Sequence, residues 1–142
     1  MVASLAPVVT GLGRLCSVVT SAHPEKQVSS QALQNPLDTY IISRIHQLRE
    51  QLTEGMEEYD LPRALSGVMP FIDDLSNWFA RRSRRRFWKS EDDSDKMEAY
   101  ATLYYVLVYL AKILAPFTPF LAEELYQQMT GSGESGHLLD WP

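Results

Sequence analysis

Several residue types and patterns are scarce in this 142-residue chain, and each scarcity excludes a class of protein. A single cysteine, Cys16, rules out an intrachain disulfide, and the three scattered histidines offer no metal-ligand spacing. No apolar run approaches the roughly 20 residues that a membrane span needs, so we expect a soluble, cytoplasmic protein with no membrane partner. No stretch alternates apolar and polar residues as a half-buried strand does, which favours an all-α fold.

Arrangements typical of enzyme sites are also missing. The stretch Gly131-Ser132-Gly133 lacks the lysine and the preceding strand of a phosphate-binding loop. The acidic run 91–95 lacks the glycine and glutamate spacing of a calcium loop. Adjacent carboxylates such as Asp73-Asp74 and Glu123-Glu124 point about 100° apart on a helix, so we interpret them as surface or ion-pair residues. We therefore predict no catalytic residue, no metal site and no cofactor in this chain.

Positive charge, in contrast, is concentrated in one place. Residues 77–89 hold six of the 13 Lys and Arg and no acid; since the whole chain carries −5, the remainder carries −11. These cations are interleaved with aromatic residues, namely Trp78, Phe79, Phe87 and Trp88. Arginines with interspersed aromatics suit a folded RNA, which offers phosphates and flat bases. The alternative is that the arginines solvate a helix end and pair with the acidic run 91–95.

Helical periodicity predicts an antiparallel bundle of about four helices. The first follows Pro36, because apolar residues between Leu37 and Tyr59 recur every three or four positions. Asp60 as N-cap then predicts a second helix over about 61–88. We expect this second helix to be kinked at Pro70, which removes a backbone donor.

The other two helices are predicted in the second half of the chain. One runs over about 96–115 with Ser94 or Asp95 as its N-cap, and its face is Met97, Ala101, Tyr104, Leu107 or Val108, Ala111 and Leu114. The next begins at Thr118-Pro119 and stops at Gly131, with core candidates Phe120, Leu121, Leu125 and Met129. We thus expect the bundle to occupy residues 36–130. Residues 1–35 form an uncertain N-terminal segment or linker, and 131–142 a flexible tail that leads into a further C-terminal region.

The six cations are not equivalent when the helix is projected at about 100° per residue. With Arg81 at zero, Arg85 and Lys89 fall near about 40° and 80°, whereas the apolar face centres near about 160°. Arg86 falls close to the apolar face, at about 140°, with Arg82 between the two sets. We therefore expect Arg81, Arg85 and Lys89 to face solvent beside Trp78. Arg82 and Arg86 should form structural ion pairs inside the bundle or run past its end to RNA.

At this point several motifs resemble one family. They are NPLD and IISR within 35–44, YDL at 59–61, FIDDLSNWFARRSRRRFW at 71–88, LAKILAPFTPFLAEELY at 110–126 and HLLDWP at 137–142. Together they resemble the anticodon-binding domain of isoleucyl-tRNA synthetases, which are class I aminoacyl-tRNA synthetases. The resemblance covers about three-quarters of the chain, and the motif at 77–88 is its most specific part. The phrase at 115–124 is shared more loosely with the valine, leucine and methionine enzymes.

The resemblance implies a monomeric, all-helical bundle that docks on the anticodon stem-loop of a tRNA, the isoleucine tRNA above all. The resemblance does not assign the contacts; charge and aromatic character predict that Arg81, Arg84, Arg85 and Lys89 meet the tRNA phosphates and that Trp88 or Trp78 meets unstacked loop bases. The resemblance also implies a second partner, the catalytic domain, which in such enzymes uses ATP and Mg. The ATP-site signatures of the family are absent here, so we expect this chain to bind tRNA without aminoacylating it alone. The alternative is a protein-interaction module that docks a partner or the catalytic domain without touching RNA.

Overall fold

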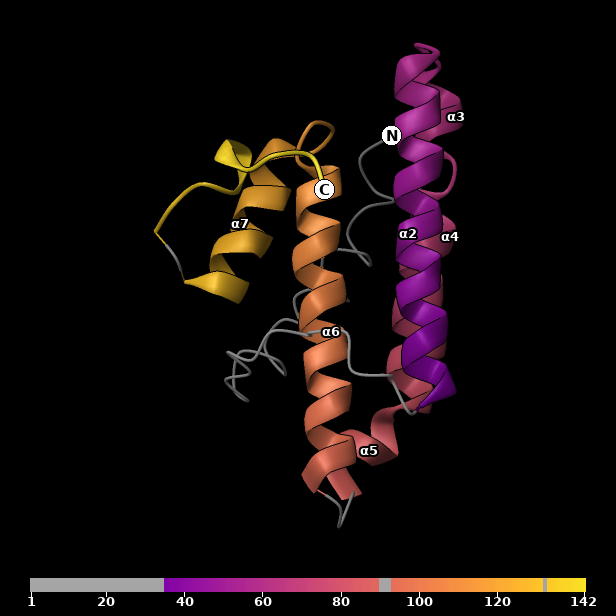
Figure 1. Cartoon of the computed structure of the whole chain (residues 1–142), viewed down its shortest axis with the longest axis vertical. Helices are drawn as coiled ribbons and strands as arrows, with labels where there is room; N and C mark the ends of the chain where they lie inside the picture. Colours follow the sequence, from indigo (N-terminus) through magenta and orange to yellow (C-terminus); the bar gives the residue numbers. More distant parts are fainter. Residues whose placement is uncertain (1–34, 90–92, 132) are drawn as a thin grey trace.

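The computed structural model describes residues 35–89, 93–131 and 133–142, apart from the side chains of residues 88, 89 and 93. Within these ranges every regular element is a helix, which confirms the all-α bundle. The long helices α2 (Pro36–Glu57) and α6 (Asp93–Leu114) begin at the same end, where α5 (Arg84–Lys89) joins them (Figure 1). Apart from Asn35, the uncertain segment 1–35 lies outside the described residues.

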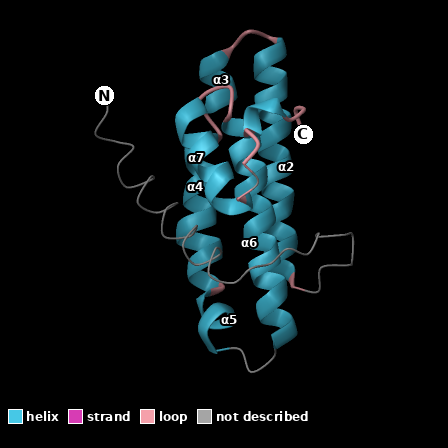
Figure 2. Cartoon of the chain, turned by 90° about the vertical axis from the view of Figure 1, so that its left-hand side faces the viewer, coloured by secondary structure: helices cyan, strands magenta, loops and turns pink. Residues whose placement is uncertain are grey.

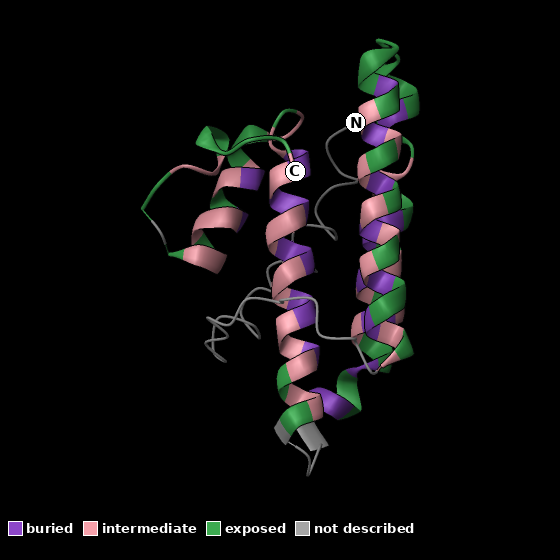
Figure 3. Ribbon diagram, in the orientation of Figure 1, coloured by how far each residue is buried: buried purple, intermediate pink, exposed green. Residues whose placement is uncertain are grey.

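The bundle is built around α6. Helix α2 contacts α6 on one side, and α7 (Pro119–Thr130) packs on α6 and runs back along it. The segments that follow α2 descend beside it towards α5, as a view turned by 90° shows (Figure 2). Buried positions follow the inner faces of all these helices (Figure 3).

Helix α2 forms where the periodicity predicts it. The side chain of Asn35 caps it by accepting the Leu37 N–H at 3.0 Å, and Pro36 occupies the first helical position. Its inner face is Ile41, Ile45, Leu48 and Leu52, all buried. Tyr59, which the periodicity assigned to the same face, is 93% exposed because the helix ends at Glu57 and Tyr59 takes a left-handed φ of 59°.

The turn between α2 and α3 (Leu61–Leu65) is tight. Asp60 accepts the Arg63 N–H at 3.1 Å, which confirms Asp60 as the N-cap. A Cβ on Gly55 would lie 2.6 Å from the Cβ of Ala64, which real contacts do not reach. Gly55 is therefore needed for the close approach of the two helices.

The expected single helix over 61–88 is instead four segments: α3, α4 (Val68–Asp73), η1 (Asp74–Ala80) and α5. The first interruption is at Ser66 and Gly67, one turn before Pro70. A helical proline clashes with the carbonyl four residues earlier, here that of Ser66, which accounts for this position. A kink at Pro70 itself stays a prediction. The element η1 is a π-helix, whose turn is wider than that of an α-helix.

The predicted face of α6 is confirmed in its second half and wrong in its first half. Leu107, Ala111 and Leu114 are buried as predicted, whereas Met97 is 47% exposed and Ala101 and Tyr104 are only half-buried. The buried residues also include some that were not predicted: Ala99, Thr102, Leu103, Val106, Leu110 and Ile113. The buried face is broad because α6 is covered by α2 on one side and by α7 on another. The helix also begins at Asp93, so Ser94 and Asp95 lie inside its first turn and are not its N-cap.

By length and composition alone, α6 is the one helix in the described ranges that could cross a membrane. Half of its apolar window is buried within the bundle. The core helix of a soluble protein passes the same test, so this is weak evidence for a span.

Helix α7 begins and ends as predicted, and its predicted core is confirmed in part. Thr118 stands at its N-cap position without a side-chain capping bond, and Gly131 ends it with a φ of 59°. Leu125 is buried and Met129 packs against the core as predicted, whereas Phe120 is 91% exposed and Ala122, which was not predicted, is buried. The first turn of α7 therefore directs its aromatic ring away from α6.

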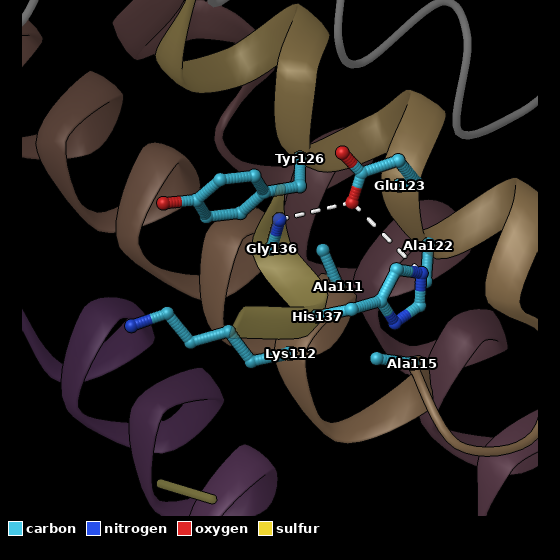
Figure 4. Close-up of a pocket in the computed structure, with 8 residues that line it drawn as sticks. All are labelled: Ala111, Lys112, Ala115, Ala122, Glu123, Tyr126, Gly136 and His137. Carbon is cyan, nitrogen blue, oxygen red and sulfur yellow. Dashed lines mark hydrogen bonds and ion pairs between the residues drawn. The ribbon is translucent and has the colours of Figure 1, made fainter. Parts of the chain in front are cut away.

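The segment after α7 is held against the bundle, which the sequence did not indicate. The Glu123 carboxylate accepts the Gly136 N–H at 2.9 Å and the Ser135 hydroxyl at 3.0 Å, and the His137 ring lies beside it (Figure 4). The pKa of Glu123 is lowered, first by the Gln127 hydrogen bond and then by those of Ser135 and Gly136. Further on, the Trp141 indole N–H donates to the Thr53 hydroxyl of α2 at 3.2 Å.

Candidate nucleic-acid interface

The arginine-rich stretch spans the end of η1, a turn and helix α5. Ser83 forms the turn: its N–H donates to the Phe79 carbonyl, and its own carbonyl accepts from Arg86 and Phe87. Phe79, Ser83 and Phe87 are buried, so the stretch is anchored at three points to the end of the core. Ala80 and five arginines lie between these anchors, and the arginines differ in whether they face the interior or solvent.

Arg86 is the arginine that turns inward. Its two terminal nitrogens donate to the two carboxylate oxygens of Asp38, both at 2.9 Å, and its Nε donates to Asp95 at 2.8 Å. Asp38 is fully buried and Arg86 is 9% exposed. This bidentate arrangement is the strongest form of an arginine–carboxylate pair. Arg86 thus ties α5 to the first turns of both α2 and α6.

The electrostatics of this pair keep Arg86 charged. Burial by itself lowers the pKa of Arg86, because it penalises the charged form. The hydrogen bonds and charges of Asp38 and Asp95 outweigh that effect and raise the pKa above that of free arginine. Two alternatives were expected for Arg86, an ion pair inside the bundle and a contact with RNA. In the structure Arg86 forms the ion pair.

Four other arginines of the stretch are exposed: Arg81, Arg82, Arg84 and Arg85. Within the described part of the chain, Arg81 and Arg85 form no ion pair or hydrogen bond. They are open to an anionic partner at the end of the bundle where α2 and α6 begin. The backbone of Trp88 and Lys89 continues α5, but their side chains lie outside the described residues.

Arg82 was expected either to form an ion pair inside the bundle or to run past its end, and it does not form the ion pair. Its guanidinium lies over the Trp78 ring, 5.1 Å from the ring centroid, and the side chain is exposed. A projection at constant pitch fails here because the wider turns of η1 and the break at Ser83 change the register of the following side chains. Arg82 therefore belongs with the solvent-facing arginines.

Trp78 is the centre of an aromatic cluster that sequence reasoning only half identified. Its ring lies 4.5 Å from that of Tyr40, centroid to centroid, at an interplanar angle of 50°. Tyr40 comes from the second turn of α2 and is 41% exposed. The cluster thus combines a cation with two aromatic rings, which is the composition of a base-stacking platform.

The same surface continues along α2, and the sequence analysis missed this part. One turn beyond Tyr40, Arg44 donates to Asp74 of η1 from Nε at 3.2 Å and from a terminal nitrogen at 3.1 Å. Arg44 also donates to the Gln47 side-chain oxygen at 3.1 Å. The spacing of Tyr40 and Arg44 by four residues was the available signal, but only the pairing of α2 with η1 shows that Tyr40 contacts Trp78 and that Arg44 pairs with Asp74.

No metal-binding cluster accompanies this surface: the described residues contain no group of three or more His, Cys, Asp or Glu that could hold a metal ion. What the geometry offers is exposed guanidinium groups for phosphates beside partly exposed rings for bases. Phosphates and bases are the groups that such side chains suit.

Comparison with known proteins agrees with the motifs. Residues 38–142 match the family described as the anticodon-binding domain of tRNA ligase. The isoleucine–tRNA ligase of Chlamydia trachomatis serovar D is 48% identical over 108 residues, which cover 75% of this chain and 10% of that protein. The isoleucine–tRNA ligase of Dehalococcoides mccartyi strain 195 is 50% identical over 111 residues, covering 75% of this chain and 11% of that protein. The chain spans about a tenth of the length of these relatives.

A match over residues 38–142 covers well over half of the chain, and the relatives share about half of its residues there. The chain belongs to the family of anticodon-binding domains of tRNA ligases and is similar to those of the isoleucine enzymes.

Proposed function

We propose that this chain is the tRNA-binding module of an isoleucine–tRNA ligase and that it holds the anticodon arm of the isoleucine tRNA. The observation that carries the proposal is the cluster of Arg81, Arg82, Arg84 and Arg85, exposed beside Trp78 and Tyr40. Support also comes from the relatives described above, which are isoleucine–tRNA ligases.

The two kinds of group have different tasks in this proposal. The guanidinium groups of Arg81, Arg84 and Arg85, with Lys89, neutralise phosphates and release the counterions bound to them. The rings of Trp78 and Trp88 stack on unpaired loop bases, each worth roughly 1–3 kcal/mol. Aminoacylation with ATP and Mg is the task of a catalytic domain, with which this bundle works as a monomeric arm in the cytoplasm.

The test is a filter-binding titration with isoleucine tRNA, and with a second tRNA for comparison, at several salt concentrations. The variant R81A/R85A is expected to bind more weakly and to reduce the slope of log affinity against log salt by up to about two. A variant with the affinity and slope of the wild type would exclude this arginine cluster as the RNA surface.

A second function has its own observation. Tyr59, Phe120 and Leu138 are 93%, 91% and 82% exposed. They belong to the α2–α3 turn, the first turn of α7 and the segment after α7, at the end of the bundle away from α5. Such exposed apolar side chains suit a protein partner such as the catalytic domain. If Y59S/F120S weakens binding to that domain while tRNA affinity is unchanged, both functions operate at opposite ends.

A further inference from the structure

A hollow of about 310 Å3 opens where α3 ends and α4 begins. It lies between this interruption and the side of α2 that carries Arg44, Leu48 and Gln51. Its apolar surface comes from Leu48, Phe71 and Pro70, and its polar groups come from Arg44, Gln47, Gln51 and Ser66. Leu48 and Phe71 are buried core residues, so the apolar surface is fixed by the bundle rather than by mobile side chains.

This hollow continues the candidate interface. Arg82 lies over Trp78, Trp78 contacts Tyr40, and Arg44 follows Tyr40 by one turn of α2 and borders the hollow. From Tyr40 to Gln51 the distance along α2 is roughly 16 Å at 1.5 Å per residue. A single-stranded loop lying on the arginine end can therefore reach the hollow with its next nucleotides.

The charges around the hollow favour a neutral group over a phosphate. Arg44 is the one cation that borders it, and its Nε and one terminal nitrogen already donate to Asp74. Arg81 and Arg85, which form no ion pair or hydrogen bond in the described part of the chain, lie instead at the α5 end. Phosphates are thus attracted to that end, whereas the hollow offers apolar walls and amide groups.

The amides present one donor and one acceptor. Gln51 donates its nitrogen to the Arg63 carbonyl at 3.1 Å and to the Ser66 hydroxyl at 2.9 Å, which fixes the amide and leaves its oxygen without a donor among the described residues. Gln47 accepts from Arg44, so its nitrogen is the part that has no described partner. A donor and an acceptor beside an apolar wall match the edge and the face of a nucleobase.

Gly67 keeps the hollow open. Its φ of −80° is ordinary helical backbone, so glycine is not required there for conformation. A Cβ at this position would lie 2.5 Å from the Gln51 side-chain oxygen and 3.1 Å from a methyl carbon of Leu48. Any larger residue would therefore displace the Gln51 amide and fill the space.

We propose that this hollow is a subsite for one unstacked nucleobase of the RNA, held against Pro70 and read by the Gln47 nitrogen and the Gln51 oxygen. The inference rests on the proposed function, since it places a base of the same bound RNA one step beyond the arginine end. It adds a recognition element that neither the arginine-rich motif nor its spacing indicates.

The experiment compares the wild type with G67A and Q47A, and uses Q128A as a matched substitution of an exposed glutamine on α7. Each protein is titrated with a transcript of the anticodon arm of isoleucine tRNA, and with transcripts that carry an abasic site at one loop position at a time. We expect G67A and Q47A to weaken binding of the intact arm at least fivefold, with an unchanged salt slope. A fivefold loss is about 1 kcal/mol, the low end for a stacked base.

The abasic series identifies the occupant. At one loop position, removal of the base should lower the affinity of the wild type at least fivefold. The same abasic site should not lower the affinity of G67A further, because in G67A that base no longer has a site to occupy. If no position shows this loss of coupling, the hollow is not a base subsite.

If R81A/R85A weakens binding while G67A and Q47A match Q128A, the subsite is wrong and the proposed function stands. If R81A/R85A also has no effect, the proposed function itself is wrong. Because the added Cβ of G67A would meet the Gln51 oxygen at 2.5 Å, G67A is expected to lower the melting temperature, and the exposed Q47A tests the subsite without this steric change.

Discussion

Replacing Arg86 by methionine tests the division of the arginines most directly. The substitution keeps most of the side-chain volume and removes the guanidinium. Asp38, which is 0% exposed to solvent, then loses both charge-assisted hydrogen bonds of 2.9 Å. Breaking a buried ion pair on one side costs about 3–5 kcal/mol, because the remaining charge stays buried without its partner. Against the usual total of about 5–15 kcal/mol, this loss would remove a large share of the stability of the bundle.

The assay is urea unfolding followed by circular dichroism, with the stability change taken from the midpoint at constant slope. R85M is the control, because Arg85 lies next to Arg86 on the same short helix but is exposed; it should change stability by no more than about 0.5 kcal/mol. The double variant D38N/R86M removes both buried charges and should be more stable than the sum of the single losses implies. If R86M loses less than about 1 kcal/mol and resembles R85M, the pair does not hold the fold and the reasoning fails.

Three further predictions follow from buried or closely packed groups. G55A should lower stability by about 1–3 kcal/mol in thermal unfolding, although alanine normally favours a helix, because its Cβ would meet Ala64; a rise in melting temperature would contradict this packing. T102V should raise stability by about 1 kcal/mol, since the buried Thr102 hydroxyl has no hydrogen-bond partner among the described residues; a lower melting temperature would contradict that assignment. The pKa of Glu123 is lowered in the fold, so its contribution is present above the ordinary glutamate pKa and is lost as pH falls through the folded value. E123Q should therefore melt below the wild type at neutral pH and approach it near pH 3, and a difference that is constant with pH would argue against this role.

Sequence patterns predicted those features that depend on local chemistry. Pro36 starts α2, Asp60 caps α3, and Gly131 ends α7, because capping and turn residues act within a few positions of themselves. The inner face of α2 was also predictable, since a helix packed on one side has one apolar stripe.

Features that depend on tertiary packing were not predictable in this way. The first half of the buried face of α6 was misplaced because two neighbours cover the helix. Of the two alternatives for Arg82, the ion pair inside the bundle was wrong because η1 has a wider turn than the projection assumed. Tyr40 could be linked to Trp78 only once α2 was paired with η1. The fold class and the arginine-rich end thus came from local pattern, whereas the shape of the interface came from the packing of α2 against the broken second helix.

Arg86 also affects the geometry of the interface, and this effect can be measured as a change in tRNA affinity. Its guanidinium joins α5 to Asp38 of α2 and Asp95 of α6, so it fixes the orientation of the helix that carries Arg84 and Arg85. Lysine at this position keeps the charge but cannot form the bidentate pair. R86K should therefore weaken tRNA binding by misplacing its neighbours, while the salt slope stays that of the wild type because no phosphate contact is removed. If R86M, which removes the cation, reduces the slope by about one, as the loss of one phosphate contact requires, then Arg86 leaves its carboxylates when RNA binds. The buried ion pair would in that case be a feature of the free protein alone.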